Sequence, residues 1–283
     1  MTDATKENLA IILVPGSFSP PHFYAKVSRQ LVIDGFSNVR ECQLLSAAPL
    51  LDQRHPPAKI EDDALYIREV IQAYLEKGKD VIVVMNSYAG LPGTEAIKGL
   101  PSRSTLTPSP ADGASRNGGV VGMIYLSSFL PFPGDTLRSL MSDSLFEPLK
   151  SGTPGGYMIL PNESGPGIFN DLYAAGKEAE AKYQFEQMIT HSSDSFDGKV
   201  TNDIWSKENA FQGQVVYIIG ECDVVVPPTL AEGMISKVAE TVENKVKVVR
   251  VQDGGHVMHV SKPDEVVAVV EGVVADLQKA SAT

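Results

Sequence analysis

A serine near the middle of the chain follows a run of β-branched residues and could act as a nucleophile. Residues 81–84 read Val-Ile-Val-Val, Ser87 comes three residues later, and residues 88–98 favour a helix. A buried strand, a tight turn that carries a hydroxyl and a following helix are the parts of a nucleophile elbow. Such a hydroxyl needs a base to take its proton and donors to stabilise the oxyanion that it creates. The alternative role for Ser87 is to cap the following helix.

Two later segments place a carboxylate and an imidazole just after predicted strands. Asp223 comes four residues after the apolar run 215–219, and His256 follows the run 246–251 across a glycine turn. An aspartate can hold an imidazole in the tautomer that accepts a proton from serine, and it stabilises the cation that results. The order Ser87, Asp223, His256 predicts a proton-relaying cluster at the carboxyl ends of the strands, where active sites of such sheets lie.

Each of these residues also has an alternative reading or a rival. Asp223 could simply close a turn or cap a helix, and Glu221 is a neighbouring carboxylate. His259, three residues after His256, competes for the role of base and is expected where the next helix begins. The two histidines could also be metal ligands, but the sequence offers no third ligand, and we expect no metal.

The loop after the first predicted strand is the candidate for the oxyanion hole. Residues 15–18 read Pro-Gly-Ser-Phe, and Gly16 allows the backbone to approach a substrate closely. In this architecture one backbone N–H comes from that loop and the other from the residue after the nucleophile. The predicted donors are therefore the backbone N–H groups of Ser17 and Tyr88.

Strands and helices alternate at both ends of the chain, which predicts a doubly wound, mostly parallel sheet of about six strands with helices on both faces. Between Pro131 and about residue 209 the alternation stops, and helical pieces are separated by proline and glycine. We therefore predict a core at 1–130 and 210–283 with an inserted helical cap at 131–209. Residues 101–119 are expected to form a long surface loop. The strands are expected at 11–15, 39–45, 81–86, 119–126, 215–219 and 246–251, and helices at 22–33, 62–75, 88–98, 136–149, 168–189, 229–242 and 263–279.

Composition narrows the class of partner. The 283 residues are 43% hydrophobic and carry a formal net charge of −11, without a long basic run. This charge argues against nucleic acid or an anionic membrane as a partner. Two cysteines, Cys42 and Cys222, make no disulfide framework, and no apolar segment reaches the roughly 20 residues of a membrane span. We expect a cytoplasmic protein with a small-molecule substrate; a homodimer is compatible with the sequence.

Together these motifs make the chain resemble an α/β-hydrolase from Leu9 to about Leu277. Three features resemble plant methylesterases and hydroxynitrile lyases: a sheet that starts directly at residues 11–16, the pair Pro227-Pro228 and the run 255–263. The elbow at residues 84–90 resembles still more closely that of fungal hydrolase-like proteins, many of which serve secondary metabolism. The resemblance implies Ser87 as nucleophile, His256 as base, Asp223 as its orienting acid and Ser17 and Tyr88 as oxyanion donors.

The chain departs from the family pattern at four positions. Val257 stands where the lyases carry lysine, and Gly16 stands where they carry threonine, so cyanohydrin chemistry is not expected. Asn86 replaces the usual histidine or glutamate before the nucleophile. Met85 lies where strand and helix approach closely and a smaller residue is usual, whereas Ala89 on the other side is small enough.

The expected reaction is acyl transfer to water from a small, fairly apolar ester, lactone or thioester, without a metal or organic cofactor. A second hypothesis keeps the fold and uses His256 as a general base in a cyclase, lyase or C–C bond-cleaving step. A third is a ligand receptor without catalysis. Some apolar residues of the cap should line the pocket and the others should form the core of the cap: Phe132, Leu140, Met141, Leu145, Phe146, Met158, Ile168 and Phe169.

Overall fold

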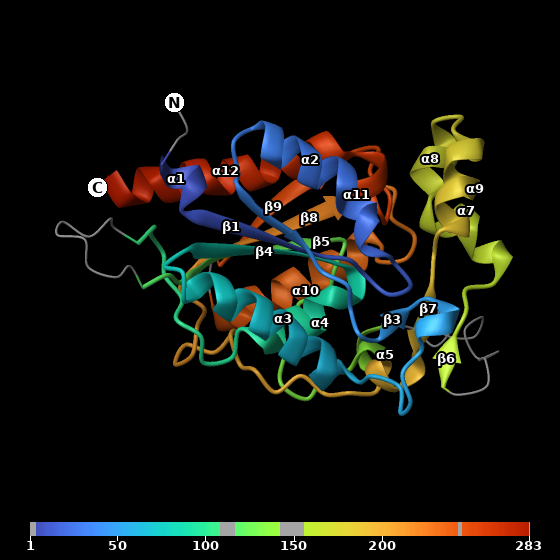
Figure 1. The fold of residues 1–283 in the computed structure, drawn as a ribbon, viewed down its shortest axis with the longest axis horizontal. Helices are drawn as coiled ribbons and strands as arrows, with labels where there is room; N and C mark the ends of the chain where they lie inside the picture. The colour runs from blue at the N-terminus through green and yellow to red at the C-terminus, as the bar shows by residue number, and fades with distance from the viewer. Residues whose placement is uncertain (1–3, 108–116, 142–155, 243–244, 283) are drawn as a thin grey trace.

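The fold is built on one twisted sheet of six parallel strands (Figure 1). The computed structural model describes residues 4–107, 117–141, 156–242 and 245–282. The strand order is β2-β1-β4-β5-β8-β9, so the chain starts one strand from an edge, adds β2 at that edge and then crosses back to build toward the other edge. This doubly wound arrangement confirms the predicted fold class, and it gathers the carboxyl ends of the strands along one edge of the sheet.

The central strands form because their residues are apolar on both faces, as a parallel sheet covered on both sides requires. Every residue of β1, β4 and β5 is buried. The outer strands are more polar, and β2 ends at Glu41, earlier than predicted. The six strands are β1 (Leu9–Val14), β2 (Asn38–Glu41), β4 (Asp80–Asn86), β5 (Val120–Leu126), β8 (Gln214–Gly220) and β9 (Val246–Val251).

Helices cover both faces of this sheet (Figure 1). On one face lie the helices from the two ends of the chain, which pack on Ile11, Ile82 and Ile124. On the other face lie helices from the part of the chain between these two end segments, which pack on Ile12, Val83 and their neighbours. The first group is α1 (Ala4–Glu7), α2 (Ala25–Ile33), α11 (Met258–Ser261) and α12 (Pro263–Ala282), with the 3-10 turn η1 (Pro21–Tyr24); the second is α3 (Ile60–Leu75), α4 (Gly90–Ala96) and α10 (Pro228–Thr241).

The chain between β5 and β8 leaves the sheet and forms short elements. Its pieces α7, α8 and α9 lie beside the sheet rather than over either face (Figure 1). The range 168–189, predicted as one helix, is divided among α7, α8 and α9, because Phe169 leaves the helical conformation and Gly176 has a φ of +70°. The helix predicted at 136–149 is described only at α5, and 142–155 lie outside the described residues. The elements are α5 (Leu137–Leu140), β6 (Tyr157–Met158), η5 (Asn162–Ser164), α7 (Gly165–Ile168), α8 (Asn170–Ala174), α9 (Glu178–Glu186), β7 (Thr190–Ser192) and η6 (Ser193–Phe196).

A small second sheet ties this segment to the first third of the chain. The two-residue strand β3 (Ala47–Ala48) pairs antiparallel with β7, which pairs antiparallel with β6. The sequence did not predict this sheet. The predicted boundary of a cap at 131–209 stays a prediction, and part of the loop predicted at 101–119 lies outside the described residues. In the described ranges, no helix combines the length and the hydropathy that crossing a membrane requires.

Candidate active site

Ser87 occupies a strained turn between β4 and α4. Its φ is +53°, a left-handed conformation that residues other than glycine rarely adopt and that costs about 1 kcal/mol or more. The turn is held by close backbone packing on both sides. A methyl group at Gly16 would lie 2.9 Å from Cβ of Ser87, and one at Gly90 would lie 2.4 Å from the Phe129 carbonyl oxygen. The geometry is that of the predicted elbow, with the 3-10 turn η3 (Ser87–Ala89) leading into the helix.

Met85, the large residue on β4 before the elbow, fits because the facing helix α4 carries a glycine. Met85 is fully buried, and its sulfur lies where a side chain on Gly93 would stand, 2.3 Å from the position of a Cβ. The space that a small residue on β4 would otherwise provide is therefore provided by a glycine on α4. The departure from the family pattern at Met85 leaves the turn intact.

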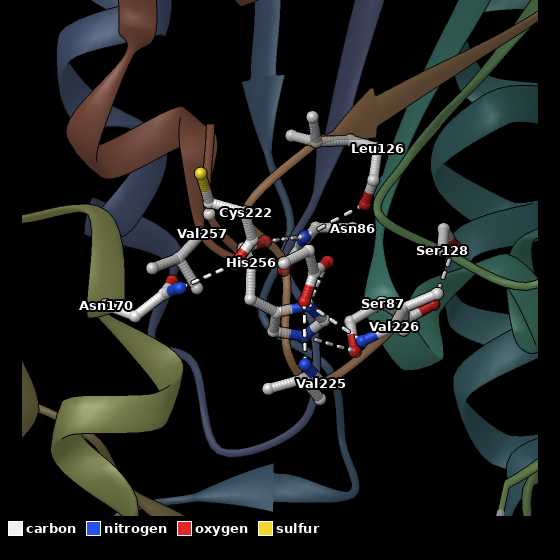
Figure 2. A network of polar contacts seen from close by, with 12 residues as sticks. Asn86, Ser87, Leu126, Ser128, Asn170, Cys222, Val225, Val226, His256 and Val257 are labelled. Carbon is white, nitrogen blue, oxygen red and sulfur yellow. Dashed lines mark hydrogen bonds and ion pairs between the residues drawn. The ribbon is translucent and has the colours of Figure 1, made fainter. Parts of the chain in front are cut away.

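Ser87, His256 and Asp223 form one hydrogen-bonded chain. Nε2 of His256 lies 2.9 Å from Oγ of Ser87, and Nδ1 of the same ring lies 3.0 Å from Oδ2 of Asp223. Figure 2 shows the imidazole turned toward the serine. Because a carboxylate can only accept a hydrogen bond, Nδ1 carries the proton and Nε2 presents its lone pair to the hydroxyl. The three residues come from the ends of β4, β8 and β9.

The carboxylate that bonds to the imidazole belongs to Asp223 and not to Glu221. The Asp223 side chain is fully buried, and its Oδ1 accepts hydrogen bonds from the backbone N–H groups of Val225 (2.8 Å) and Val226 (2.9 Å). These two bonds hold one carboxylate oxygen in place while the other oxygen, Oδ2, faces the imidazole. Glu221 instead forms an ion pair with Arg250 at 2.6 Å on the surface.

His259, the rival base, is enclosed in the protein interior. It lies in α11, is fully buried and stacks on Tyr24 with ring centroids 4.3 Å apart. Neither ring nitrogen has a hydrogen-bond partner within the described ranges. Burial, reinforced by nearby His256, lowers the pKa of His259 to about 3. The ring is therefore neutral and has no hydrogen bond to the serine. Among the residues that the structure places, no three His, Cys, Asp or Glu side chains could hold a metal ion.

The hydrogen-bonded chain opens into one apolar pocket of about 240 Å³. Among the described residues that line the pocket, His256 alone has an ionisable side chain. Met141 and Ile168 contribute to the wall as expected, whereas Phe132, Leu140, Met158 and Phe169 pack into the surrounding core. Leu145 and Phe146 lie outside the described residues. Besides residues near the serine and the histidine, the wall includes Leu137, Leu160, Gly167, Met188, Phe196 and Val224.

Comparison with known sequences places the chain in a family. The sequence profile of the alpha/beta hydrolase family matches residues 11–269. The chain belongs to the alpha/beta hydrolase family. This hydrolase is similar to the probable hydrolase R7 of a Phoma species, at 30% identity over 257 residues that cover 90% of this chain and 93% of the relative. It is 24% identical to the alpha/beta hydrolase nvfD of Aspergillus novofumigatus, over 94% and 97% of the two chains.

Solved structures share the same fold at low identity. The methylesterase MES16 from Arabidopsis superposes with a TM-score of 0.69 at 15% identity, covering 94% of this hydrolase and 99% of that chain. A pyrethroid hydrolase from Sphingobium faniae gives a TM-score of 0.65 at 17% identity, with 94% and 98% covered. The resemblance to plant methylesterases and fungal hydrolases that the sequence indicated is thus confirmed at the level of family and fold.

Asn86 connects the elbow of this hydrolase to the loop that carries the histidine. Its amide nitrogen donates to the carbonyl oxygens of Leu126 (3.0 Å) and His256 (3.1 Å), as Figure 2 shows. The hydroxyl of Ser128 donates to the Ser87 carbonyl oxygen at 2.6 Å and supports the turn from the end of β5. The sequence singled out Asn86 only as a departure from the family and carried no signal for Ser128.

The two predicted oxyanion donors lie on either side of the elbow. Ser17 lines the pocket in a tight turn in which the Ser19 N–H donates to the Gly16 carbonyl at 3.3 Å and Phe18 has a φ of +60°. Tyr88 directly follows Ser87 and is fully buried. Both residues are adjacent to the serine, while their role as donors stays a prediction.

The side chain of Tyr88 extends away from the pocket into a buried polar cluster. Its hydroxyl donates to Oδ2 of Asp63 at 2.9 Å, and the backbone N–H and hydroxyl of Ser46 donate to the same carboxyl group. Burial raises the pKa of Asp63 to about 6, since the hydrogen bonds only partly offset the loss of water. Nearby His191 is also buried, and burial lowers its pKa to about 3. The cluster anchors the residue after the nucleophile, and no sequence motif indicated it.

Proposed function

We propose that this hydrolase uses Ser87 as the nucleophile, His256 as the general base and Asp223 as its orienting acid to cleave small, apolar carbonyl esters, lactones or thioesters. The observation that carries the proposal is the unbroken chain of hydrogen bonds from Oγ of Ser87 to Oδ2 of Asp223 at the wall of an apolar pocket. The family membership supports hydrolysis as the type of reaction.

In the first half of the reaction, Oγ of Ser87 attacks the carbonyl carbon while Nε2 of His256 takes the hydroxyl proton. The carbonyl oxygen becomes an oxyanion, which the backbone N–H groups of Ser17 and Tyr88 stabilise. The intermediate collapses, the leaving alcohol or thiol receives the proton from His256, and an acyl-enzyme remains. In the second half, water gives a proton to His256 and attacks the acyl group, and the acid leaves as Ser87 recovers its proton.

The pocket supports an uncharged substrate. Within the part of the wall that the structure describes, no basic side chain is present to pair with a substrate carboxylate or phosphate and no acidic one to pair with an amine. Moving an unpaired charge into such surroundings is costly, whereas apolar groups gain roughly 25 cal/mol for each Å² that they bury. The volume of about 240 Å³ favours a compact acyl or ring group over a long chain.

Labelling with a fluorophosphonate probe tests the nucleophile. The wild-type protein should react covalently at Ser87, and Ser87→Ala should not react, with His256→Ala strongly slowed. A series of p-nitrophenyl esters of increasing acyl length should then show a maximum of kcat/KM at short chains. A folded wild-type protein that takes up no label would contradict the proposal.

Two other outcomes would redirect the assignment. Turnover of a substrate that survives in Ser87→Ala but is lost in His256→Ala would assign a cyclase, lyase or C–C bond-cleaving reaction in which the histidine is a general base. Saturable binding of a ligand without turnover by the wild-type protein would indicate a receptor on a hydrolase fold.

A further inference from the structure

The start of α8 contacts both loops that carry the proposed acid and base. Asn170 and Asp171 belong to the segment between β5 and β8, far in sequence from β9 and its following loop. Asp171 is 5% exposed, and of its partners Gly255 and Leu172 are buried while Ser261 is partly buried. Burying a carboxylate costs free energy unless it is hydrogen-bonded, so the groups that donate to Asp171 show what stabilises it in this position.

The Asp171 carboxylate is bonded to the loop of the histidine. Its Oδ2 accepts a hydrogen bond from the backbone N–H of Gly255 at 3.0 Å and another from the hydroxyl of Ser261. Its Oδ1 accepts one from the N–H of Leu172 at 2.9 Å. Gly255 directly precedes His256, and Ser261 ends the short helix that follows it. Asp171 therefore holds the backbone of the residue before the histidine and the end of the helix that follows it.

Asn170 makes the corresponding contact with the loop of the aspartate. Its amide nitrogen donates to the Cys222 carbonyl oxygen at 2.5 Å, next to Asp223 in the chain, as Figure 2 shows. The fit is tight: a methyl group at Gly255 would lie 2.6 Å from Oδ1 of Asn170 and 2.7 Å from Cγ of Asp171. The two loops are also joined directly, because the Cys222 N–H donates to the Gly254 carbonyl at 2.9 Å.

We propose that Asp171 is a positioning residue that fixes the orientation of His256 toward Ser87, an inference that rests on the proposed function of these two residues. Asp171 holds the N–H of Gly255, the residue before the histidine, and Asn86 holds the histidine carbonyl. With both sides of His256 held, the ring keeps Nε2 in line with the serine hydroxyl. Misplacement of a reacting group by about 1 Å can cost on the order of a hundredfold in rate.

The test uses Asp171→Asn and inactivation by a fluorophosphonate, analysed for binding (KI) and chemistry (kinact) separately. The amide nitrogen cannot accept the two hydrogen bonds that Oδ2 accepts, so we expect kinact to fall roughly tenfold or more while KI stays near the wild-type value. For turnover of a p-nitrophenyl ester, kcat should fall in parallel and KM should change little. Asp253→Asn is the matched control, since Asp253 lies on the same loop but is exposed and pairs with Lys262; its kinact should equal that of the wild type.

Stability is measured alongside reactivity. A purely structural role for Asp171 would lower Tm and leave kinact of the folded protein unchanged, and that result would overturn the proposal. If Asp171→Asn does not fold, Asn170→Ala and Ser261→Ala carry the test, because each removes one contact of the same cluster. Wild-type kinact in both of these variants would equally overturn it.

Hydrogen exchange separates this proposal from the proposed function. The Gly255 amide should exchange faster in Asp171→Asn than in the wild type, whether or not the protein is reactive. If the wild type takes up no label, the assignment of Ser87 fails, and exchange still decides whether Asp171 holds the loop. An unchanged exchange rate at Gly255 would overturn the positioning role.

Discussion

Replacing His259 with phenylalanine tests whether this histidine is buried in its neutral form. In the native protein its pKa is about 3, and in an unfolded chain it is close to the ordinary value of 6.5. On acidification from pH 7 to pH 5, the unfolded chain therefore binds a proton at His259 and the native protein does not. When the native pKa of a histidine is depressed, the native state loses stability as the pH falls below the unfolded pKa. The wild type should therefore be destabilised over this range.

The magnitude follows from the two pKa values. Integrating the difference in bound protons from pH 7 to pH 5 gives about 2 kcal/mol that the wild type loses and His259→Phe does not. Phenylalanine also changes the packing against Tyr24, but that contribution is the same at both pH values and cancels in the difference. His191, whose pKa is also lowered to about 3, is present in both proteins and cancels as well.

Urea unfolding at pH 7, 6 and 5 measures this difference. Trp205 is the single tryptophan and is fully buried, so its fluorescence reports the loss of the core. Tyr24→Phe is the control, because it alters the same ring stack, and burial raises the tyrosine pKa further above this range. Its stability relative to the wild type should not change between pH 7 and pH 5. A constant difference between wild type and His259→Phe across the series would refute the reasoning.

Three further results are expected. Asp223→Asn should lower kcat by roughly 10⁴-fold, because the imidazole would no longer be held in the tautomer that accepts the serine proton, whereas Glu221→Gln should leave kcat unchanged in the same ester assay. Gly93→Ala should destabilise the fold by about 1–3 kcal/mol in urea unfolding, since its methyl group meets the Met85 sulfur; a double-mutant cycle with Met85→Ala should recover part of the loss, and additive costs would contradict the contact. Asp63→Asn should show a pH dependence opposite to that of His259→Phe: a carboxyl whose native pKa is raised to about 6 favours the native state at low pH, so the wild type should lose about 1 kcal/mol relative to the variant from pH 5 to pH 7. A difference that stays constant over this range would show that burial does not raise the pKa of Asp63.

The sheet and the order of the proposed reactive residues could be predicted from sequence because both depend on local signals. The run before Ser87 is apolar at every position, as a strand buried on both faces must be. Parallel strands place their carboxyl ends along one edge, so Asp223 and His256 could be assigned to the same site from their positions alone. The sequence also favoured His256 over His259, which it placed where the next helix begins; that His259 is enclosed and stacked on Tyr24 could be seen only in the folded chain.

The features that sequence reasoning missed are contacts between distant segments. The strands β3, β6 and β7 have two or three residues each, too few for a periodic pattern, and they form only by pairing with one another. The departure at Met85 could not be judged because its compensation, Gly93, lies on another element. Asp171 lies in an unremarkable helical stretch, and only the folded chain brings it to Gly255.

The segment between β5 and β8 supplies both much of the pocket wall and, at Asp171, the contact with the histidine loop. Selectivity and reactivity are therefore not independent modules in this enzyme. Transplanting that segment from a relative should bring a new substrate preference, but the chimera should work at full speed only if the donor carries its own equivalent of the Asp171 contact. Engineering that varies Met141, Leu160 or Met188 singly avoids this difficulty, because these side chains line the cavity and leave the Asp171 contact in place.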